Sequence, residues 1–213
     1  MQARGVEPNI PSHLRIAVTG HRRLPDSEEL SARVDEALDV HIPALFDPAN
    51  RSPIGTEPRT PLAFTVLTAL AEGADRYVAE TILERPNVEI EVVLPLTADD
   101  YIEDFETAAS RAEFRRLLAL VRQPVALRAR PLAADCAPSE LAEARKRAYE
   151  DLGRYLVQHC DVLLAVWDGE PARGRGGTAE VVQYARSIGR PVVVIRTKKP
   201  GGIEVYAAGG IST

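Results

Sequence analysis

A glycine-rich segment in the last third of the chain has the residue types that bind a phosphate group. Gly176, Gly177 and Thr178 follow an apolar run and open a new helical pattern. The first amides of a helix have no partner inside the helix, and the aligned peptide dipoles add partial positive charge there. Glycine lets an anion approach the backbone closely, Thr178 can cap the helix or donate its hydroxyl, and Arg175 can cover a phosphate. The segment predicts a site for a phosphate-bearing small molecule. The alternative interpretation is that the same residues form only a tight connection between a strand and a helix.

A second candidate segment, Gly20-His21-Arg22, follows the first apolar run of the chain. The Arg22 guanidinium presents two parallel donors that suit two phosphate oxygens. His21 could donate to a phosphate or act as an acid or a base. The alternative is that both are solvated loop residues.

Carboxylates follow two other apolar runs. Asp168 ends the run before the glycine-rich segment, where a carboxylate could bind a ribose hydroxyl or transfer a proton. Glu72 follows an earlier run and could also bind a ribose hydroxyl. Gly73 and Gly169, beside these carboxylates, are further candidate ligand contacts. The two cysteines have neither disulfide nor zinc spacing, so no metal and no cofactor are expected.

The elements that must position these residues alternate along the chain. Apolar or β-branched runs predict strands at residues 14–19, 62–70, 88–94, 125–130, 160–168 and 191–195, with 203–206 as a possible edge strand. Helical spacing separates them, including one long helix from Thr97 or Asp99 to about Val121. Alternation of this kind predicts an α/β fold, in which a mostly parallel sheet has helices on both faces. Ligands bind such sheets at the carboxyl ends of the strands, so residues 20–22, 71–75, 168–169 and 175–178 should share one edge.

The chain length of 213 residues fits one large domain. We expect that domain to span residues 14–197, with a proline-rich surface loop at 47–61, a flexible N-terminus at 1–13 and a glycine-rich tail at 198–213. The net charge of -5 disfavours a general nucleic-acid or membrane-surface binder, because both need a basic surface. Neither a signal peptide nor a membrane-spanning run is recognisable, so a cytoplasmic location is expected.

Several short stretches occur in an order that resembles a known group of proteins. They are residues 19–22, 70–75, 95–96, 160–169 and 175–180, together with Tyr101 and Phe105. This order is similar to that of the SLOG superfamily, which includes the Lonely Guy phosphoribohydrolases and the DNA-processing protein DprA. The resemblance covers about Leu14 to Ile195 and is closest to bacterial stand-alone SLOG-like proteins. It implies a single Rossmann-like domain, a pocket for a nucleotide or a nucleotide-derived phosphate ester, and commonly a homodimer.

The resemblance to the Lonely Guy enzymes also implies an activity, the cleavage of an N-glycosidic bond. Lonely Guy enzymes carry Pro-Gly-Gly-x-Gly-Thr-x-x-Glu, and Gly176-Gly177-Thr178 match the end of the glycine-threonine part. No Pro-Gly-Gly precedes them, and Glu180 lies two residues after the threonine instead of three, a rotation of about 100° on a helix.

Three hypotheses follow. The first is a module that binds a nucleotide-like small molecule. The second is an N-glycoside hydrolase of nucleoside 5′-monophosphates, with Glu180 or Asp168 as the catalytic carboxylate. The third is DprA-like binding of single-stranded DNA, which the acidic balance and the 5% aromatic content disfavour.

Overall fold

The computed structural model describes residues 12–24, 28–46, 62–83, 85–121, 124–127, 137–171, 176–198 and 201–208. The predicted surface loop at 47–61, residues 1–11 of the predicted N-terminus, and Arg175 lie outside these ranges. The strands are β1 (Ser12–Gly20), β2 (Leu62–Thr68), β3 (Val88–Leu94), β4 (Val125–Ala126), β5 (Val162–Trp167), β6 (Val192–Arg196) and β7 (Ile203–Tyr206). The helices are α1 (Glu28–Glu36), the π-helical turn η1 (Ala37–His41), α2 (Ile42–Phe46), α3 (Ala74–Ile82), α4 (Ala98–Ile102), α5 (Ala108–Ala119), α6 (Pro138–Gln158) and α7 (Thr178–Ser187).

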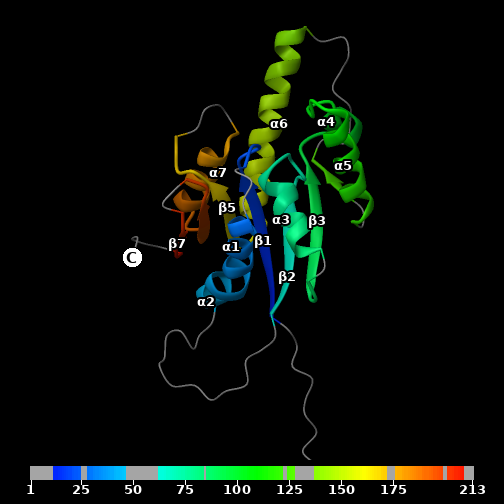
Figure 1. Cartoon of the computed structure of the whole chain (residues 1–213). Coiled ribbons are helices and arrows are strands. Elements are labelled where there is room, and N and C mark those ends of the chain that lie inside the picture. The colour runs from blue at the N-terminus through cyan, green and yellow to red at the C-terminus, as the bar shows by residue number, and fades with distance from the viewer. Residues whose placement is uncertain are drawn as a thin grey trace, which may run out of the picture.

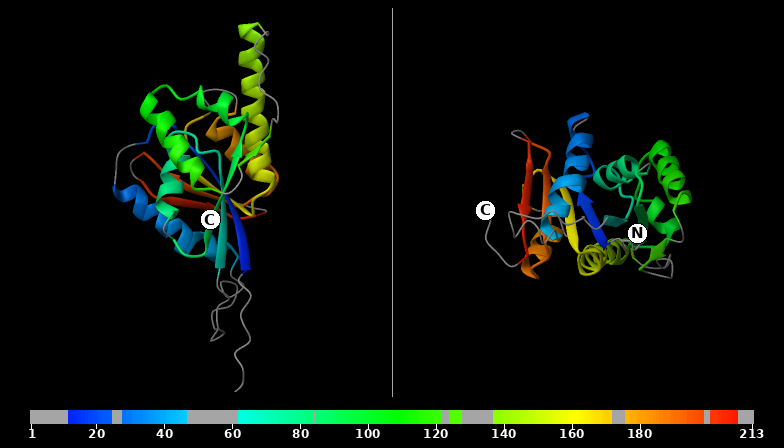
Figure 2. Two further views of the ribbon diagram at one scale, coloured as in Figure 1. Left: turned by 90° about the vertical axis from the view of Figure 1, so that its right-hand side faces the viewer. Right: turned by 90° about the horizontal axis from the view of Figure 1, so that it is seen from below.

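The strands form one sheet in the order β4-β3-β2-β1-β5-β6-β7, and every pairing is parallel except that of β7 with β6. This confirms the predicted α/β fold as a single Rossmann-like domain. Strand β5 is apolar throughout and β6 is apolar up to its last residue, as expected where helices cover both faces of a sheet. Helices α1, α2 and α3 pack with η1 on one face, and α4, α5, α6 and α7 enclose the other core (Figures 1 and 2).

The strand order reverses between β1 and β5, and this reversal places the candidate loops. From β1 the chain adds β2, β3 and β4 on one side, and then returns to add β5, β6 and β7 on the other. The register pairs Gly20 with Val166, so the carboxyl ends of β1 and β5 lie side by side. Helix α6 runs along this junction and extends beyond the carboxyl edge of the sheet (Figure 1). A reversal of this kind is where open α/β sheets bind ligands.

The prediction of one long helix at 97–121 is wrong, because the segment forms two short helices. Thr97 caps α4 by accepting from the Asp100 amide at 3.3 Å, and Thr107 caps α5 by accepting from the Ser110 amide at 3.0 Å. Between them the Phe105 ring is fully buried and packs edge-on against Tyr101, with ring centroids 5.1 Å apart. The second cap and this buried ring favour a turn over a continuous helix.

The strand predicted at 125–130 is described only at Val125–Ala126, where it pairs with β3 at the sheet edge; residues 128–130 lie outside the described ranges. The possible edge strand at 203–206 is confirmed as β7, so the sheet continues past residue 197. Among the described helices, none combines the length and apolarity needed to span a bilayer.

Candidate functional site

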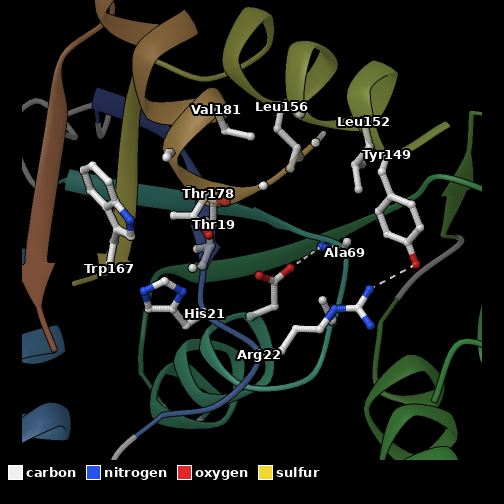
Figure 3. A pocket seen from close by; sticks show the side chains of 18 of the residues that line it. Thr19, His21, Arg22, Ala69, Tyr149, Leu152, Leu156, Trp167, Thr178 and Val181 are labelled. Carbon is white, nitrogen blue, oxygen red and sulfur yellow. Dashed lines mark hydrogen bonds between the residues drawn. The ribbon is translucent and has the colours of Figure 1, made fainter. Parts of the chain in front are cut away.

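A cavity of 380 Å³ lies at the carboxyl edge of the sheet, where β1 meets β5 (Figure 3). Its walls come from the end of β1, the β2–α3 connection, α4, α6, the end of β5 and the start of α7. Residues 20–22 and 176–178, which are far apart in the sequence, both line it. Ala71 and Asp75 line it as well, as do Trp167 and Glu170 on either side of residues 168–169. The structure thus brings residues of three sequence-predicted segments, 20–22, 71–75 and 175–178, to the cavity, and the fourth segment, 168–169, lies next to its lining.

Two glycines, Gly20 and Gly73, allow the segments beside the cavity to pack closely. A Cβ on Gly20 would overlap with the Ala74 side chain and lie 2.5 Å from the Val166 carbonyl oxygen. Gly73 has a φ of 80°, and a Cβ there would overlap with the carbonyl groups of His21 and Arg22. The Ala74 amide donates to the His21 carbonyl at 3.0 Å in the same contact. Gly20 lines the cavity, whereas Gly73 lies outside it and holds the β1 loop against α3.

The start of α7 presents backbone donors to the cavity. Gly177, not Thr178, is the N-cap residue, so Thr178 is the first helical residue and its side chain lies against the cavity (Figure 3). The amides of Gly177, Thr178 and Ala179 have no hydrogen-bond acceptor among the residues that the structure describes. All three residues line the cavity. The helix start therefore retains the unsatisfied donors that an anion needs.

Glu180 lies away from this opening. Its carboxylate accepts from the Gly176 amide at 2.7 Å, and the side chain is exposed outside the cavity lining. Gly176 has a φ of 75° and packs against Tyr149, where an added Cβ would lie 3.1 Å from the Tyr149 Cβ. Glu180 thus stabilises the turn before α7 from the outer side.

His21 and Asp168 form a pair at one end of the cavity. His21 Nε2 lies 2.8 Å from Asp168 Oδ1, and the Asp168 side chain is only 8% exposed. His21 lines the cavity beneath Trp167 in the view of Figure 3, whereas Asp168 is not among the lining residues. Burial alone would raise the pKa of Asp168, but hydrogen bonds from the Glu170 amide, His21 and Lys198 lower it to about 2. Asp168 is therefore ionised at neutral pH and orients His21.

Arg22 lies on the opposite side of the cavity, against Tyr149 of α6. Its Nη2 donates to the Tyr149 hydroxyl at 3.3 Å, and the guanidinium lies 5.7 Å from the ring centroid (Figure 3). The Tyr149 hydroxyl donates to Asp104 at 2.6 Å, and Arg145 pairs with the same carboxylate at 2.5 Å. Burial lowers the pKa of Arg22, but Tyr149, Tyr101 and Asp104 raise it more, so Arg22 remains cationic.

Two buried groups complete the interior. The Asp75 carboxylate accepts from the Thr68 hydroxyl and the Ala69 amide, each at 3.0 Å, and burial raises its pKa to about 6. Tyr101 of α4 is fully buried and also lines the cavity. Sequence reasoning did not propose Tyr101 or Tyr149 as ligand contacts. The spacing of Tyr149 with Leu152, Gly153 and Leu156 was the available signal, because i, i+3, i+4 and i+7 share one helix face.

The remaining candidates have structural partners outside the cavity lining. The Glu72 carboxylate accepts from the Ser110 hydroxyl of α5. Gly169 has a φ of 86°, and the Arg196 guanidinium occupies the space that a Cβ would need. Arg175 lies outside the described residues.

Across the described part of the chain, no three His, Cys, Asp or Glu side chains are arranged to hold a metal ion. Comparison of the chain with protein-family models and with curated proteins found no match.

Proposed function

We propose that the protein binds a nucleotide or a nucleotide-derived, phosphate-bearing small molecule in this cavity. The observation that carries the proposal is the set of amides at Gly177, Thr178 and Ala179, which open on the same cavity as Arg22. Backbone donors at a helix start are suited to a phosphate group, and Arg22 is a charged hydrogen-bond donor elsewhere in the same cavity.

The rest of the cavity suits the organic part of such a ligand. Its 380 Å³ falls within the range of about 300–1,000 Å³ that is typical of small-molecule sites. Leu152, Leu156 and Val181 form an apolar wall beside the helix start (Figure 3). This wall can cover the face of a base or a sugar while polar groups bind its edges.

Thermal-shift measurements with nucleoside mono- and diphosphates and with inorganic phosphate test the proposal. A ligand that binds only the folded protein raises the unfolding temperature. Gly177→Val should abolish the shift, because the side chain would stand before the amides. The backbone at Gly177, with φ of -81° and ψ of 166°, accepts valine without strain. Gly202→Val is the control, because nothing lies within 4 Å of its Cβ position. Equal stabilisation of Gly177→Val and the wild type would refute the site.

A second candidate function is hydrolysis of the N-glycosidic bond of nucleoside 5′-monophosphates. The observation that favours it is His21, which lines the cavity and is held by the ionised Asp168. In that reaction His21 would take a proton from the attacking water, the hydroxyl would bond to the sugar carbon as the bond from that carbon to the base nitrogen breaks, and the departing base would receive the proton from His21. Chromatography would detect the free base. We expect release to fall with His21→Gln and Asp168→Asn and to persist with Glu180→Gln; no release from the wild type would exclude the activity.

The homodimer, the cytoplasmic location and the absence of nucleic-acid binding remain predictions. Light scattering after size-exclusion chromatography tests the first, and titration with single-stranded DNA at two salt concentrations tests the last.

A further inference from the structure

The hydroxyl of Tyr101 is a buried polar group without a hydrogen-bond partner in the part of the chain that the structure describes. The side chain is fully buried, and its ring packs edge-on against Phe105 and Phe114, with centroid distances of 5.1 and 5.6 Å. No hydrogen-bond partner for the hydroxyl is found among the described residues, although the residue lines the cavity. Buried polar groups nearly always have a partner, because an unmade hydrogen bond costs stability. The cavity is where that partner can enter.

The neighbouring groups define what the partner must be. Burial raises the pKa of Tyr101 well above its ordinary value, so the hydroxyl keeps its proton and can donate it to a hydrogen bond. Arg22, whose charge interacts with Tyr101, is a second donor. Asp75 is engaged by Thr68 and Ala69, and the Tyr149 hydroxyl is engaged by Asp104. At this end of the cavity Tyr101 and Arg22 can therefore donate hydrogen bonds, and a ligand group bound there must be a hydrogen-bond acceptor.

The charges at this end favour an uncharged acceptor over a second phosphate. The Arg22 cation is offset by the buried Asp75 and by Asp104, which lies behind Tyr149. A second phosphate would be repelled by these carboxylates, and Arg22 is the one Lys or Arg side chain among the described lining residues that could offset the repulsion. A carbonyl, a ring nitrogen or a hydroxyl meets no such repulsion and can accept from Tyr101.

We propose that the Tyr101 hydroxyl, with Arg22 beside it, binds an uncharged hydrogen-bond acceptor on the base or sugar of the ligand. The inference rests on the proposed function, in which residues 177–179 bind the phosphate. Tyr101 would then fix the orientation of the organic part and discriminate among ligands that carry the same phosphate group.

Calorimetric titration of Tyr101→Phe tests this inference, with AMP, GMP, CMP, UMP, ribose 5-phosphate and inorganic phosphate as probes. The substitution should weaken binding of the preferred mononucleotide about tenfold, the scale of one hydrogen bond, and leave inorganic phosphate unaffected. Loss that extends to ribose 5-phosphate places the acceptor on the sugar, and loss confined to nucleotides places it on the base. Tyr184→Phe is the matched control, because that hydroxyl bonds Gln158 outside the cavity.

The outcomes separate this inference from the function on which it rests. Unchanged nucleotide affinity in Tyr101→Phe, alongside abolished binding in Gly177→Val, would overturn the role of Tyr101 and leave the phosphate site standing. Failure of every probe to bind the wild type would remove both. The unliganded Tyr101→Phe protein should unfold at a temperature no lower than the wild type, since it loses only an unpartnered hydroxyl. A clearly lower temperature would show that the hydroxyl has a structural partner, and would also overturn the inference.

Discussion

Gly73→Ala should strongly destabilise the protein, because two loops meet at this residue without space for a methyl group. The added Cβ would overlap with the carbonyl oxygens of His21 and Arg22 and lie 2.5 Å from the Arg22 carbonyl carbon, all backbone atoms. Alanine at a φ of 80° and ψ of -118° carries about 1–3 kcal/mol of backbone strain. Displacing the packed β1 loop adds about 1–3 kcal/mol. We therefore expect the free energy of unfolding to fall by about 2–6 kcal/mol.

Urea unfolding followed by fluorescence measures this change directly. Trp167 is the single tryptophan of the chain and lines the cavity, so its emission reports on the affected region. Gly202→Ala is the control, since its Cβ position is open and its backbone is not left-handed. A loss below about 1 kcal/mol, or one equal to that of Gly202→Ala, would refute the packing argument. Gly73→Ala should also weaken ligand binding, because His21 and Arg22 move with the loop.

Three further predictions concern buried charges. Burial raises the pKa of Asp75 from 3.8 to about 6, so the folded state holds this proton more tightly than the unfolded state. The protonated Asp75 carboxyl therefore stabilises the folded state fully below pH 3.8, and this stabilisation, about 3 kcal/mol, is lost as the pH rises through 6. In urea unfolding at several pH values, Asp75→Asn should reduce this dependence of the free energy of unfolding on pH. Burial raises the pKa of Asp168, but its hydrogen bonds lower it more, so that the pKa falls from 3.8 to about 2. The ionised carboxylate therefore stabilises the folded state above pH 3.8, and this stabilisation should be lost as the pH falls through 2. In Asp168→Asn the free energy of unfolding should not show this fall at acid pH. Arg76→Met should cost about 2–4 kcal/mol, because the buried Arg76 donates to the Leu70 and Ser110 carbonyls, which would lose these hydrogen bonds. Arg116→Met, at an exposed pair, should cost at most about 1 kcal/mol, and similar losses would contradict the reasoning.

The sequence supported the fold because the runs at 162–167 and 192–195 are apolar on both faces and because the predicted strands alternate with helical patterns. The carboxyl ends of parallel strands lie at the same edge of a sheet whatever the strand order. The candidate loops could therefore be assigned to one edge before the strand order was known. The break at Phe105 was missed because residues 97–121 keep apolar residues at helical spacing through the turn. Only the cap at Thr107 marks that turn locally.

The site was less predictable where a contact joins distant segments. His21 and Asp168 were each identified, but their pairing requires β1 to lie beside β5. Glu180 was proposed as a catalytic residue, and its engagement by the Gly176 amide depends on a turn geometry that composition does not specify. Tyr101 and Tyr149 were not proposed as ligand contacts, because their access to a cavity follows only from where α4 and α6 pack.

The reversal of strand order also constrains how the chain can fold during synthesis. The Arg15 amide bonds Asp161, 146 residues later, so one side of β1 stays unpaired until β5 has left the ribosome. Until then β1, the middle strand of the finished sheet, is an edge strand that is apolar at residues 16–18 and able to pair with another nascent chain. A chain truncated ahead of Val162 would therefore be expected to aggregate, and complete chains to fold slowly, as their sequence-distant strand pairings require.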